Sequence, residues 1–122
     1  MHYKRIELKV TNQGIHERKI FQGVKIFSRS KLSKDQKSIL TQKVYLTPKQ
    51  NIVYYQRADV NYDQNWYHKK DYYELAYDQL DRDTIFKVCQ DFDELRSFLE
   101  NELLENLKEK QSAGKFFEKL DI

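Results

Sequence analysis

The hydrophobic period of this chain changes near residue 90, and this change constrains the fold more than any other feature of the sequence. Before it, apolar and polar residues alternate, as Ile6, Leu8 and Val10 do with their neighbours, which is typical of a half-buried β-strand. After it, apolar residues recur every three or four positions, which is typical of an amphipathic helix. The sequence therefore predicts an α+β fold, with a sheet formed by residues 1–90 and a helix after it.

Turn signals divide the first ninety residues into about six strands. Residues 12–14 (NQG) and 47–51 (TPKQN) are typical of turns, and the polar stretch 28–38 predicts a loop. The last two strands are predicted at 72–77 and 84–89. Short connections favour a strongly twisted antiparallel meander over parallel crossover units. A more closed barrel, with the helix as its plug, is the alternative.

One long C-terminal helix is predicted over residues 91–113. Asp91 and Glu94 have the spacing of a capping box at its start, and Gly114 can end it in a left-handed conformation. Its apolar stripe is expected to pack on the sheet, and consists of Phe92, Leu95, Phe98, Leu99, Leu103 and Leu107. Because no linker interrupts the 122 residues, a single domain, 1–122, is expected.

The charge of the chain is divided unequally between its two ends. Residues 1–70 hold fifteen Lys or Arg and five Asp or Glu, and residues 71–122 hold seven and fourteen, so the two parts carry +10 and −7. A basic part can attract nucleic acid. The same division also results when one half of a domain folds onto the other, and this second interpretation is favoured.

The sequence contains none of the local motifs that mark common catalytic or metal sites. Its three glycines are far apart, it has no Cys pair, and no Gly-x-Ser-x-Gly elbow occurs. No catalytic residue, metal ligand or cofactor is therefore predicted. Cys89 is interpreted as a small buried residue in a reducing compartment. Without a signal peptide or a long apolar run, a cytoplasmic protein that does not enter the membrane is expected.

A tyrosine-rich segment at 54–77 provides the first candidate site. It holds seven of the nine tyrosines and the only tryptophan, and such side chains suit a binding surface. The candidates are Tyr54, Tyr55, Trp66, Tyr67, His68, Tyr72 and Tyr73. They favour a non-catalytic binding or interaction protein, with a homodimer as one form, although ordinary strand propensity explains the same residues. A small enzyme or ligand pocket around His68, Asp71 and the tyrosines is an alternative.

A basic sheet face provides the second candidate site. If Ile6, Leu8 and Val10 point to the core, alternation sends a set of cationic and aromatic residues to the opposite side. This set consists of Lys9, Lys25, Lys43, Tyr45 and Arg57. Lysines attract phosphates and exposed rings stack on bases, so nucleic-acid binding is the alternative function. Solvated lysines that protect a sheet from aggregation are the simpler explanation.

The last residues, 115–122 (KFFEKLDI), combine apolar and acidic side chains. Leu120 and Ile122 are expected to dock on the protein's own sheet, while Glu118 and Asp121 pair with Lys or Arg. The alternative is that this terminus is a ligand for a partner protein.

Residues 17–26 (ERKIFQGVKI), 44–55 (VYLTPKQNIVYY) and the closing EKLDI resemble the EXLDI family of small bacterial proteins. The resemblance spans essentially the whole chain. It implies a cytoplasmic, stand-alone domain from a Gram-positive bacterium, and it implies no particular activity. It also draws attention to Glu118, Leu120, Asp121 and Ile122.

Overall fold

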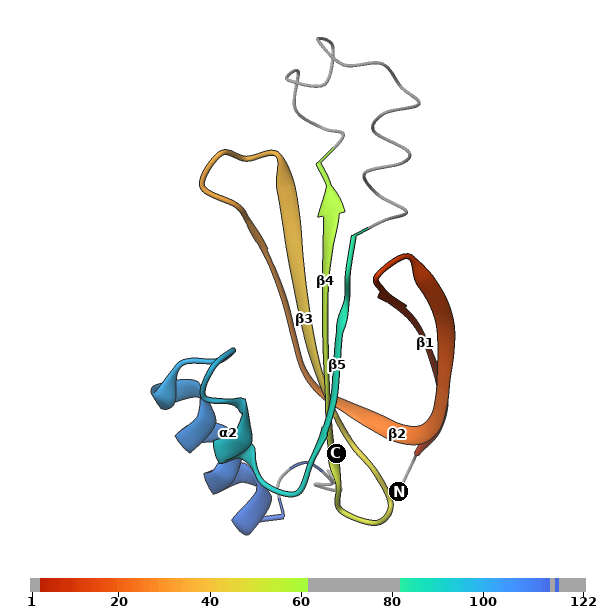
Figure 1. The fold of residues 1–122 in the computed structure, drawn as a ribbon. Coiled ribbons are helices and arrows are strands. Elements are labelled where there is room, and N and C mark those ends of the chain that lie inside the picture. Colours follow the sequence, from red (N-terminus) through yellow and green to blue (C-terminus); the bar gives the residue numbers. More distant parts are fainter. Residues whose placement is uncertain (1–2, 62–81, 115, 117–122) are drawn as a thin grey trace, which may run out of the picture.

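The protein is a curled five-stranded antiparallel sheet with one C-terminal helix packed against it (Figure 1). The computed structural model describes residues 3–61, 82–114 and 116. The strands are β1 (Lys4–Asn12), β2 (Ile15–Leu32), β3 (Ser38–Leu46), β4 (Ile52–Val60) and β5 (Ile85–Cys89). Each pairs with the next along the chain. The predicted antiparallel meander and C-terminal helix are therefore confirmed, with five strands described where about six were predicted. The strand predicted at 72–77 lies outside the described residues.

Strand β2 curls the sheet, because its two halves pair with different neighbours. Lys4 to Asn12 of β1 pair with β2 as far as Gly23, and β3 pairs with β2 from Val24 onward. A register shift between Lys25 and Phe27 bends the strand where the partner changes. The β1–β2 hairpin consequently folds back over one face of the sheet, beside β5 (Figure 1).

The loop predicted over residues 28–38 is wrong in extent. Ser28 to Leu32 continue β2 and pair with Ile39 to Lys43, so that only residues 33–37 form the turn. The polar composition of this stretch reflects an exposed part of the hairpin. Backbone pairing with β3 satisfies its peptide groups whatever the side chains are.

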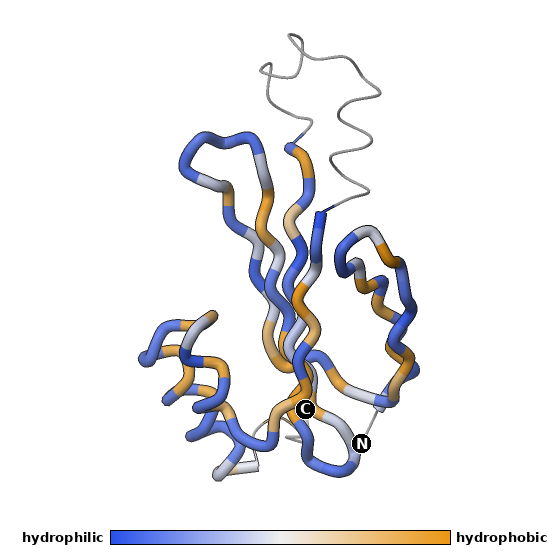
Figure 2. The backbone as a smooth tube through the Cα atoms, viewed as in Figure 1, coloured by the Kyte–Doolittle hydropathy of each residue, from blue (hydrophilic) through white to orange (hydrophobic). Residues whose placement is uncertain are grey.

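Both faces of the β3–β4 region are buried, which creates two apolar cores. The first, the helix-side core, consists of Val44, Leu46, Ile52, Tyr54, Cys89, Phe92, Leu95, Leu99, Leu104 and Leu107. The second, the hairpin-side core, consists of Leu8, Tyr45, Val53 and Tyr55, with Ile6, Val10, Phe21 and Phe86 packed against it. The buried apolar runs are residues 44–46 of β3 and 52–55 of β4, whereas the remainder of both strands mixes apolar with polar positions, as Figure 2 shows.

The predicted helix over residues 91–113 is broken into two segments. A 3-10 helix, η2 (Phe92–Leu95), is followed by a turn and then by α2 (Asn101–Ser112). The capping box is confirmed: the Asp91 carboxylate accepts a hydrogen bond from the Glu94 amide, and Glu94 accepts one from the Asp91 amide. Gly114 has a φ of 67°, as predicted for the residue that ends the helix. The helix packs against the sheet from outside and does not plug a barrel.

Contacts with the sheet explain why the helix is interrupted. Gln42 donates a hydrogen bond to the Phe98 carbonyl (3.1 Å), and the Arg29 guanidinium binds both carboxylate oxygens of Glu100 (2.6 and 2.8 Å). Glu100 has an extended backbone (φ −64°, ψ 149°). The Phe98 carbonyl is thus bound by a side chain of the sheet, and the chain turns at Glu100 before α2 begins.

Replacing Gly23 with alanine is expected to lower the free energy of unfolding by about 1–3 kcal/mol, because the bend has no room for a side chain. A Cβ atom there would lie 2.9 Å from Cε2 of Phe21 and 3.3 Å from the Leu46 carbonyl oxygen. The Phe21 ring is itself held by Tyr45, at 5.5 Å between centroids. Chemical denaturation measures the loss. The exposed neighbour Gln22→Ala is the control, expected within about 0.5 kcal/mol of the native protein, and equal stability of the two variants would contradict the packing described here.

Candidate anion-binding site

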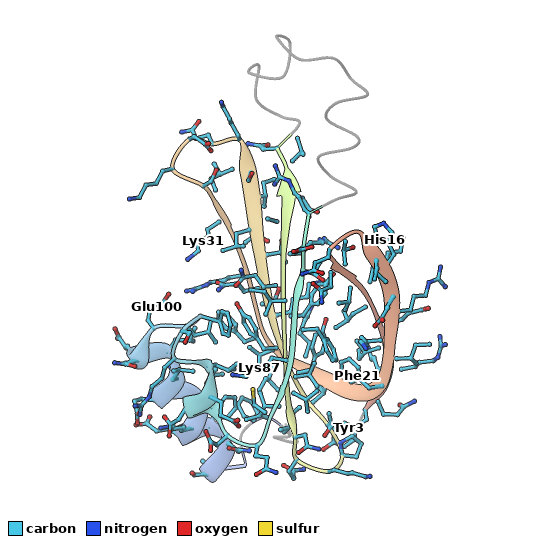
Figure 3. The ribbon with its side chains drawn as sticks, viewed as in Figure 1. Tyr3, His16, Phe21, Lys31, Lys87 and Glu100 are labelled. Carbon is cyan, nitrogen blue, oxygen red and sulfur yellow. The ribbon has the colours of Figure 1, made fainter. Side chains whose placement is uncertain are left out.

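The β1–β2 hairpin, near whose tip His16 lies (Figure 3), is tied to the rest of the protein by hydrogen bonds to its backbone groups. The Thr84 amide donates to the Thr11 carbonyl (2.9 Å), and the Thr11 amide donates to the Thr84 hydroxyl (2.9 Å). From β4, the Tyr55 hydroxyl donates to the Lys9 carbonyl (2.6 Å). These contacts hold the hairpin at a fixed distance above β4. They thereby form a cleft between the hairpin and the sheet.

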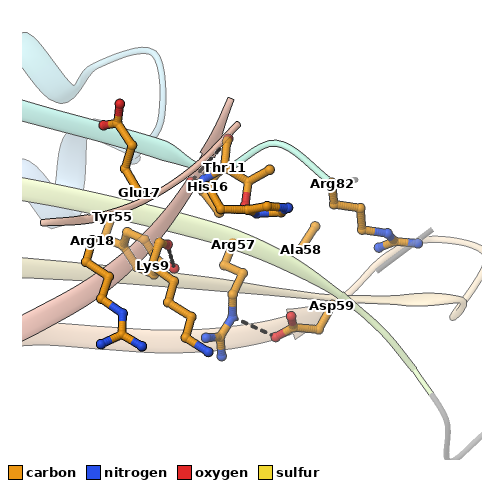
Figure 4. Close-up of a pocket in the computed structure, with 11 residues that line it drawn as sticks. Lys9, Thr11, His16, Glu17, Arg18, Tyr55, Arg57, Ala58, Asp59 and Arg82 are labelled. Carbon is orange, nitrogen blue, oxygen red and sulfur yellow. Dashed lines mark hydrogen bonds and ion pairs between the residues drawn. The ribbon is translucent and has the colours of Figure 1, made fainter. Parts of the chain in front are cut away.

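This hairpin cleft has a volume of about 520 Å³ and is rich in cationic side chains (Figure 4). It is lined by Lys9, Thr11, His16, Glu17, Arg18, Tyr55, Arg57, Ala58, Asp59, Arg82 and Thr84. Four of these residues are Lys or Arg and two are carboxylates, so the lining carries a net charge of +2 with His16 neutral. Figure 4 shows the head groups of Lys9, Arg18 and Arg57 pointing in the same direction from the two walls.

The cations of the hairpin cleft are only partly neutralised by neighbouring carboxylates. Arg57 pairs with Asp59 (2.9 Å), and Arg18 pairs with Glu7 (3.2 Å) outside the cleft. Arg82 donates to the Ser38 hydroxyl (2.9 Å). Within the described part of the chain, no carboxylate lies within ion-pairing distance of Lys9. An anion that enters the cleft therefore finds cations with hydrogen-bonding capacity to spare.

A row of cations extends from the hairpin cleft across the same face of the sheet. Lys25 of β2 lies opposite Tyr45 of β3, and Lys43 is two residues from Tyr45 along β3. Lys43 in turn lies opposite Tyr55 of β4, and Arg57 is two residues from Tyr55 along β4. The pKa of Lys43 is lowered first by burial and then by the charges of Lys25 and Arg57. Asp59, which pairs with Arg57 (2.9 Å), acts on the Lys43 pKa in the opposite direction and offsets part of this repulsion.

The predicted basic residues lie on one side of the sheet, but Ile6, Leu8 and Val10 pack on this same side and not on the opposite one as expected. The aromatic member of the set is also buried there. Lys25, Lys43 and Arg57 share this face, and Lys9 joins them from the hairpin above. Tyr45 was expected to offer a ring for stacking on a base. It is only 4% exposed and belongs to the hairpin-side core, because the β1–β2 hairpin covers it.

Two members of the predicted tyrosine-rich surface are buried, which corrects that expectation. Tyr54 is fully buried in the helix-side core, where its ring stacks on Phe98 and its hydroxyl donates to Gln56 (2.6 Å). Tyr55 is 2% exposed in the hairpin-side core. These rings point to opposite sides of β4 as predicted, but each side is covered. The other candidates lie outside the described residues: Trp66, Tyr67, His68, Asp71, Tyr72 and Tyr73, together with Glu118, Leu120, Asp121 and Ile122 of the C-terminal motif.

Sequence reasoning missed Arg18, Arg82 and His16. A signal for Arg18 was present, since the turn at residues 12–14 places it directly opposite Lys9 in the hairpin. His16 lies opposite Thr11 in the same way, and its Nδ1 is 3.0 Å from the Thr11 hydroxyl. Arg82 joins the cleft through the tertiary fold, which no local pattern indicates.

Two features of the described residues bear on the chemistry that the site can offer. They contain no group of three or more His, Cys, Asp or Glu side chains arranged to hold a metal ion. Cys89 is buried in the helix-side core, and burial raises the pKa of its thiol, which disfavours the reactive thiolate. The hairpin cleft, in contrast, offers guanidinium and ammonium donors from two walls, an arrangement suited to an oxyanion.

The fold and the site together define a small α+β domain with a cationic cleft on the concave face of a half-barrel. Comparisons with protein-family models, with curated proteins and with solved structures find no match for this chain. Among the described residues, no helix has both the length and the apolar character needed to cross a membrane.

Replacing Lys43 with methionine is expected to raise the melting temperature by about 1–3 °C. The pKa of Lys43 is lower in the folded protein than in the unfolded chain, so the charged lysine opposes folding. The free energy of unfolding therefore rises as pH increases through this lowered pKa. Methionine keeps the apolar stem without the charge. Thermal melting measures the effect, with the exposed turn residue Lys49→Met as a control that leaves the temperature unchanged. A lower melting temperature for the Lys43 variant would show that the charge of Lys43 does not oppose folding.

Proposed function

We propose that this protein is a non-catalytic binding domain whose hairpin cleft holds a phosphate-bearing anion. The observation that carries the proposal is the gathering of Lys9, Arg18, Arg57 and Arg82 around one cleft, with only two carboxylates among them. A concave site lined by one sign of charge focuses the electrostatic field and concentrates oppositely charged ligands.

The kinds of side chain support a phosphate in preference to an arbitrary anion. Three of the four cations are arginines, whose planar guanidinium groups bind two oxygens of a phosphate at once. Arg57 is oriented by its ion pair with Asp59 (2.9 Å), so its position is set before a ligand arrives. Lys9 supplies a compact charge from the opposite wall.

Isothermal titration calorimetry with inorganic pyrophosphate tests this function. Saturable binding at low ionic strength that weakens steadily as salt is added is the expected result, because screening reduces the attraction. Spermidine, a small polycation, is the matched control and should give no saturable heat. Absence of pyrophosphate binding at low ionic strength, or equal binding of both compounds, would refute the proposal.

This proposal favours the basic face over the tyrosine-rich surface as the binding site. The two described tyrosines of that surface are buried, so neither offers its ring to a partner. The cytoplasmic location, the membership of the EXLDI family and a homodimer remain predictions from the sequence. Size-exclusion chromatography with light scattering tests the last of these.

A further inference from the structure

Cations on the concave face extend well beyond the hairpin cleft, in a regular diagonal row. Each step from Lys25 to Lys43 and from Lys43 to Arg57 moves to the next strand and two residues along it, always in the same direction. The β4–β5 register ends at Gln56 opposite Ile85. Arg82 lies three residues before Ile85 and lines the cleft with Arg57, although its guanidinium also donates to the Ser38 hydroxyl (2.9 Å). This cation row therefore crosses three strands and reaches the segment before β5.

The spacing of the cation row fits a polymer with one charge per repeating unit. Diagonal neighbours in an antiparallel sheet lie about 7–8 Å apart, so successive cations can each meet a separate phosphate. A single small anion would occupy the cleft and leave Lys25 and Lys43 unused. Inorganic polyphosphate carries a charge at every P–O–P link, which is a closer spacing than the row provides.

The shape of the concave face favours a flexible strand over a duplex. The hairpin is held over β4 by the Tyr55–Lys9 hydrogen bond, and the head groups of Lys9 and Arg57 point the same way from the two walls (Figure 4), so a ligand that contacts both must follow the curve of the concave face along the cleft. Double-stranded DNA is a stiff rod with a persistence length of about 50 nm, which cannot bend into such a cleft without a large cost. A flexible single strand of nucleic acid can follow both the cation row and the cleft.

We infer that the ligand is a single-stranded nucleic acid, whose phosphate backbone follows the row Lys25–Lys43–Arg57 towards Arg82 and contacts Lys9 and Arg18 at the hairpin cleft. This inference rests on the function proposed above and specifies its ligand. Because Tyr45 and Tyr55 are buried, neither ring supplies stacking to the bases. Binding by the described residues is then electrostatic and independent of base sequence, and DNA and RNA strands bind alike.

Fluorescence anisotropy with a labelled thymidine oligonucleotide, titrated at several salt concentrations, tests the inference. The logarithm of the binding constant falls with the logarithm of salt by about 0.7 for each phosphate contact with a single strand. Lys25→Gln with Lys43→Gln removes two contacts outside the cleft. This double variant is expected to bind about tenfold more weakly and to reduce the slope by about 1.4. Lys49→Gln with Lys110→Gln removes the same charge from exposed positions, in the β3–β4 turn and on α2, and should change neither the slope nor, beyond a small effect, the affinity.

Three results would overturn the inference. The first is an unchanged salt dependence of the binding constant in the Lys25 and Lys43 variant, and the second is equal or tighter binding of a duplex of the same length. The third is displacement of the strand by polyphosphate at a lower phosphate concentration than by unlabelled oligonucleotide. Lys25→Gln alone, at an exposed position, gives a smaller change of about 0.7 in slope if the double variant fails to fold. Pyrophosphate binding separates the two proposals. If pyrophosphate binds and the slope is unchanged, the inferred ligand is wrong while the proposed function stands; if pyrophosphate does not bind, the proposed function fails.

Discussion

Replacing Phe92 with alanine is expected to lower the free energy of unfolding by about 3–5 kcal/mol. Phe92 is 1% exposed and begins the segment that packs η2 and α2 on the helix-side core. Removing the ring leaves a cavity between Leu95, the helix and the sheet, which these neighbours can fill only in part. Since small domains are stable by about 5–15 kcal/mol in total, this single change removes a large share of the stability.

Urea denaturation followed by circular dichroism measures this loss. Val88→Ala on β5 is the matched control, because Val88 is 55% exposed and its truncation should cost no more than about 0.5 kcal/mol. Similar losses in both variants would mean that the C-terminal segment does not pack on the sheet as described.

Replacing Lys9 and Arg18 together with glutamate is expected to weaken pyrophosphate binding about 100-fold. The change amounts to four units of charge on one wall of the hairpin cleft, and an exposed charge beside an anion contributes about 0.2–1 kcal/mol. Both side chains are exposed, so the fold should lose less than about 1 kcal/mol of stability. Calorimetry at constant ionic strength gives the affinity, and thermal melting shows that the variant is folded.

Lys49→Glu with Lys110→Glu is the control for this variant, since it changes the net charge equally at exposed positions outside the cleft. Its affinity should fall only slightly, through the general field of the protein. Equal weakening by both double variants would indicate non-specific attraction and contradict a defined site.

Much of the fold could be predicted from local pattern because the strands are joined by short turns. Alternation identified the strands around Ile6, Leu8 and Val10, and the turn signal at residues 12–14 correctly joined β1 to β2. The bend of β2 was missed, since it depends on a change of pairing partner at Gly23 and on the register shift after Lys25. Such a change is a long-range property that a local pattern does not contain.

The sequence contained a signal that β3 and β4 are buried on both faces. Residues 44–46 (VYL) and 52–55 (IVYY) are continuous apolar runs, and a continuous run is typical of a strand covered on both sides. Alternation correctly separated Tyr54 from Tyr55 and Val44 from Tyr45. It could not show that the β1–β2 hairpin would cover the second face, and so Tyr45 was expected to be exposed.

The prediction of one continuous helix over residues 91–113 was wrong for a related reason. The apolar period of residues 92–107 continues through the break, because Leu95, Leu99 and Leu104 all face the helix-side core. The interruption results from Arg29 and Gln42 binding Glu100 and the Phe98 carbonyl across the fold. A tertiary contact thus overrides local helix propensity at these positions.

The candidate site was predicted in part. Alternation placed Lys25, Lys43 and Arg57 on one face, and these residues lie there. The cleft itself requires the hairpin to fold back, which brings Lys9 and Arg18 over β4. Charges on separate strands become one site only through this curl.

Mapping of bound pyrophosphate by amide chemical-shift changes in NMR spectra tests the central claim most directly. The hairpin cleft predicts the largest changes at the amides of Lys9, Arg18 and Arg57, with little change along α2 on the other side of the sheet. Saturating changes that are confined to α2, or a spectrum that does not change as pyrophosphate is added at low ionic strength, would contradict an anion site on the concave face.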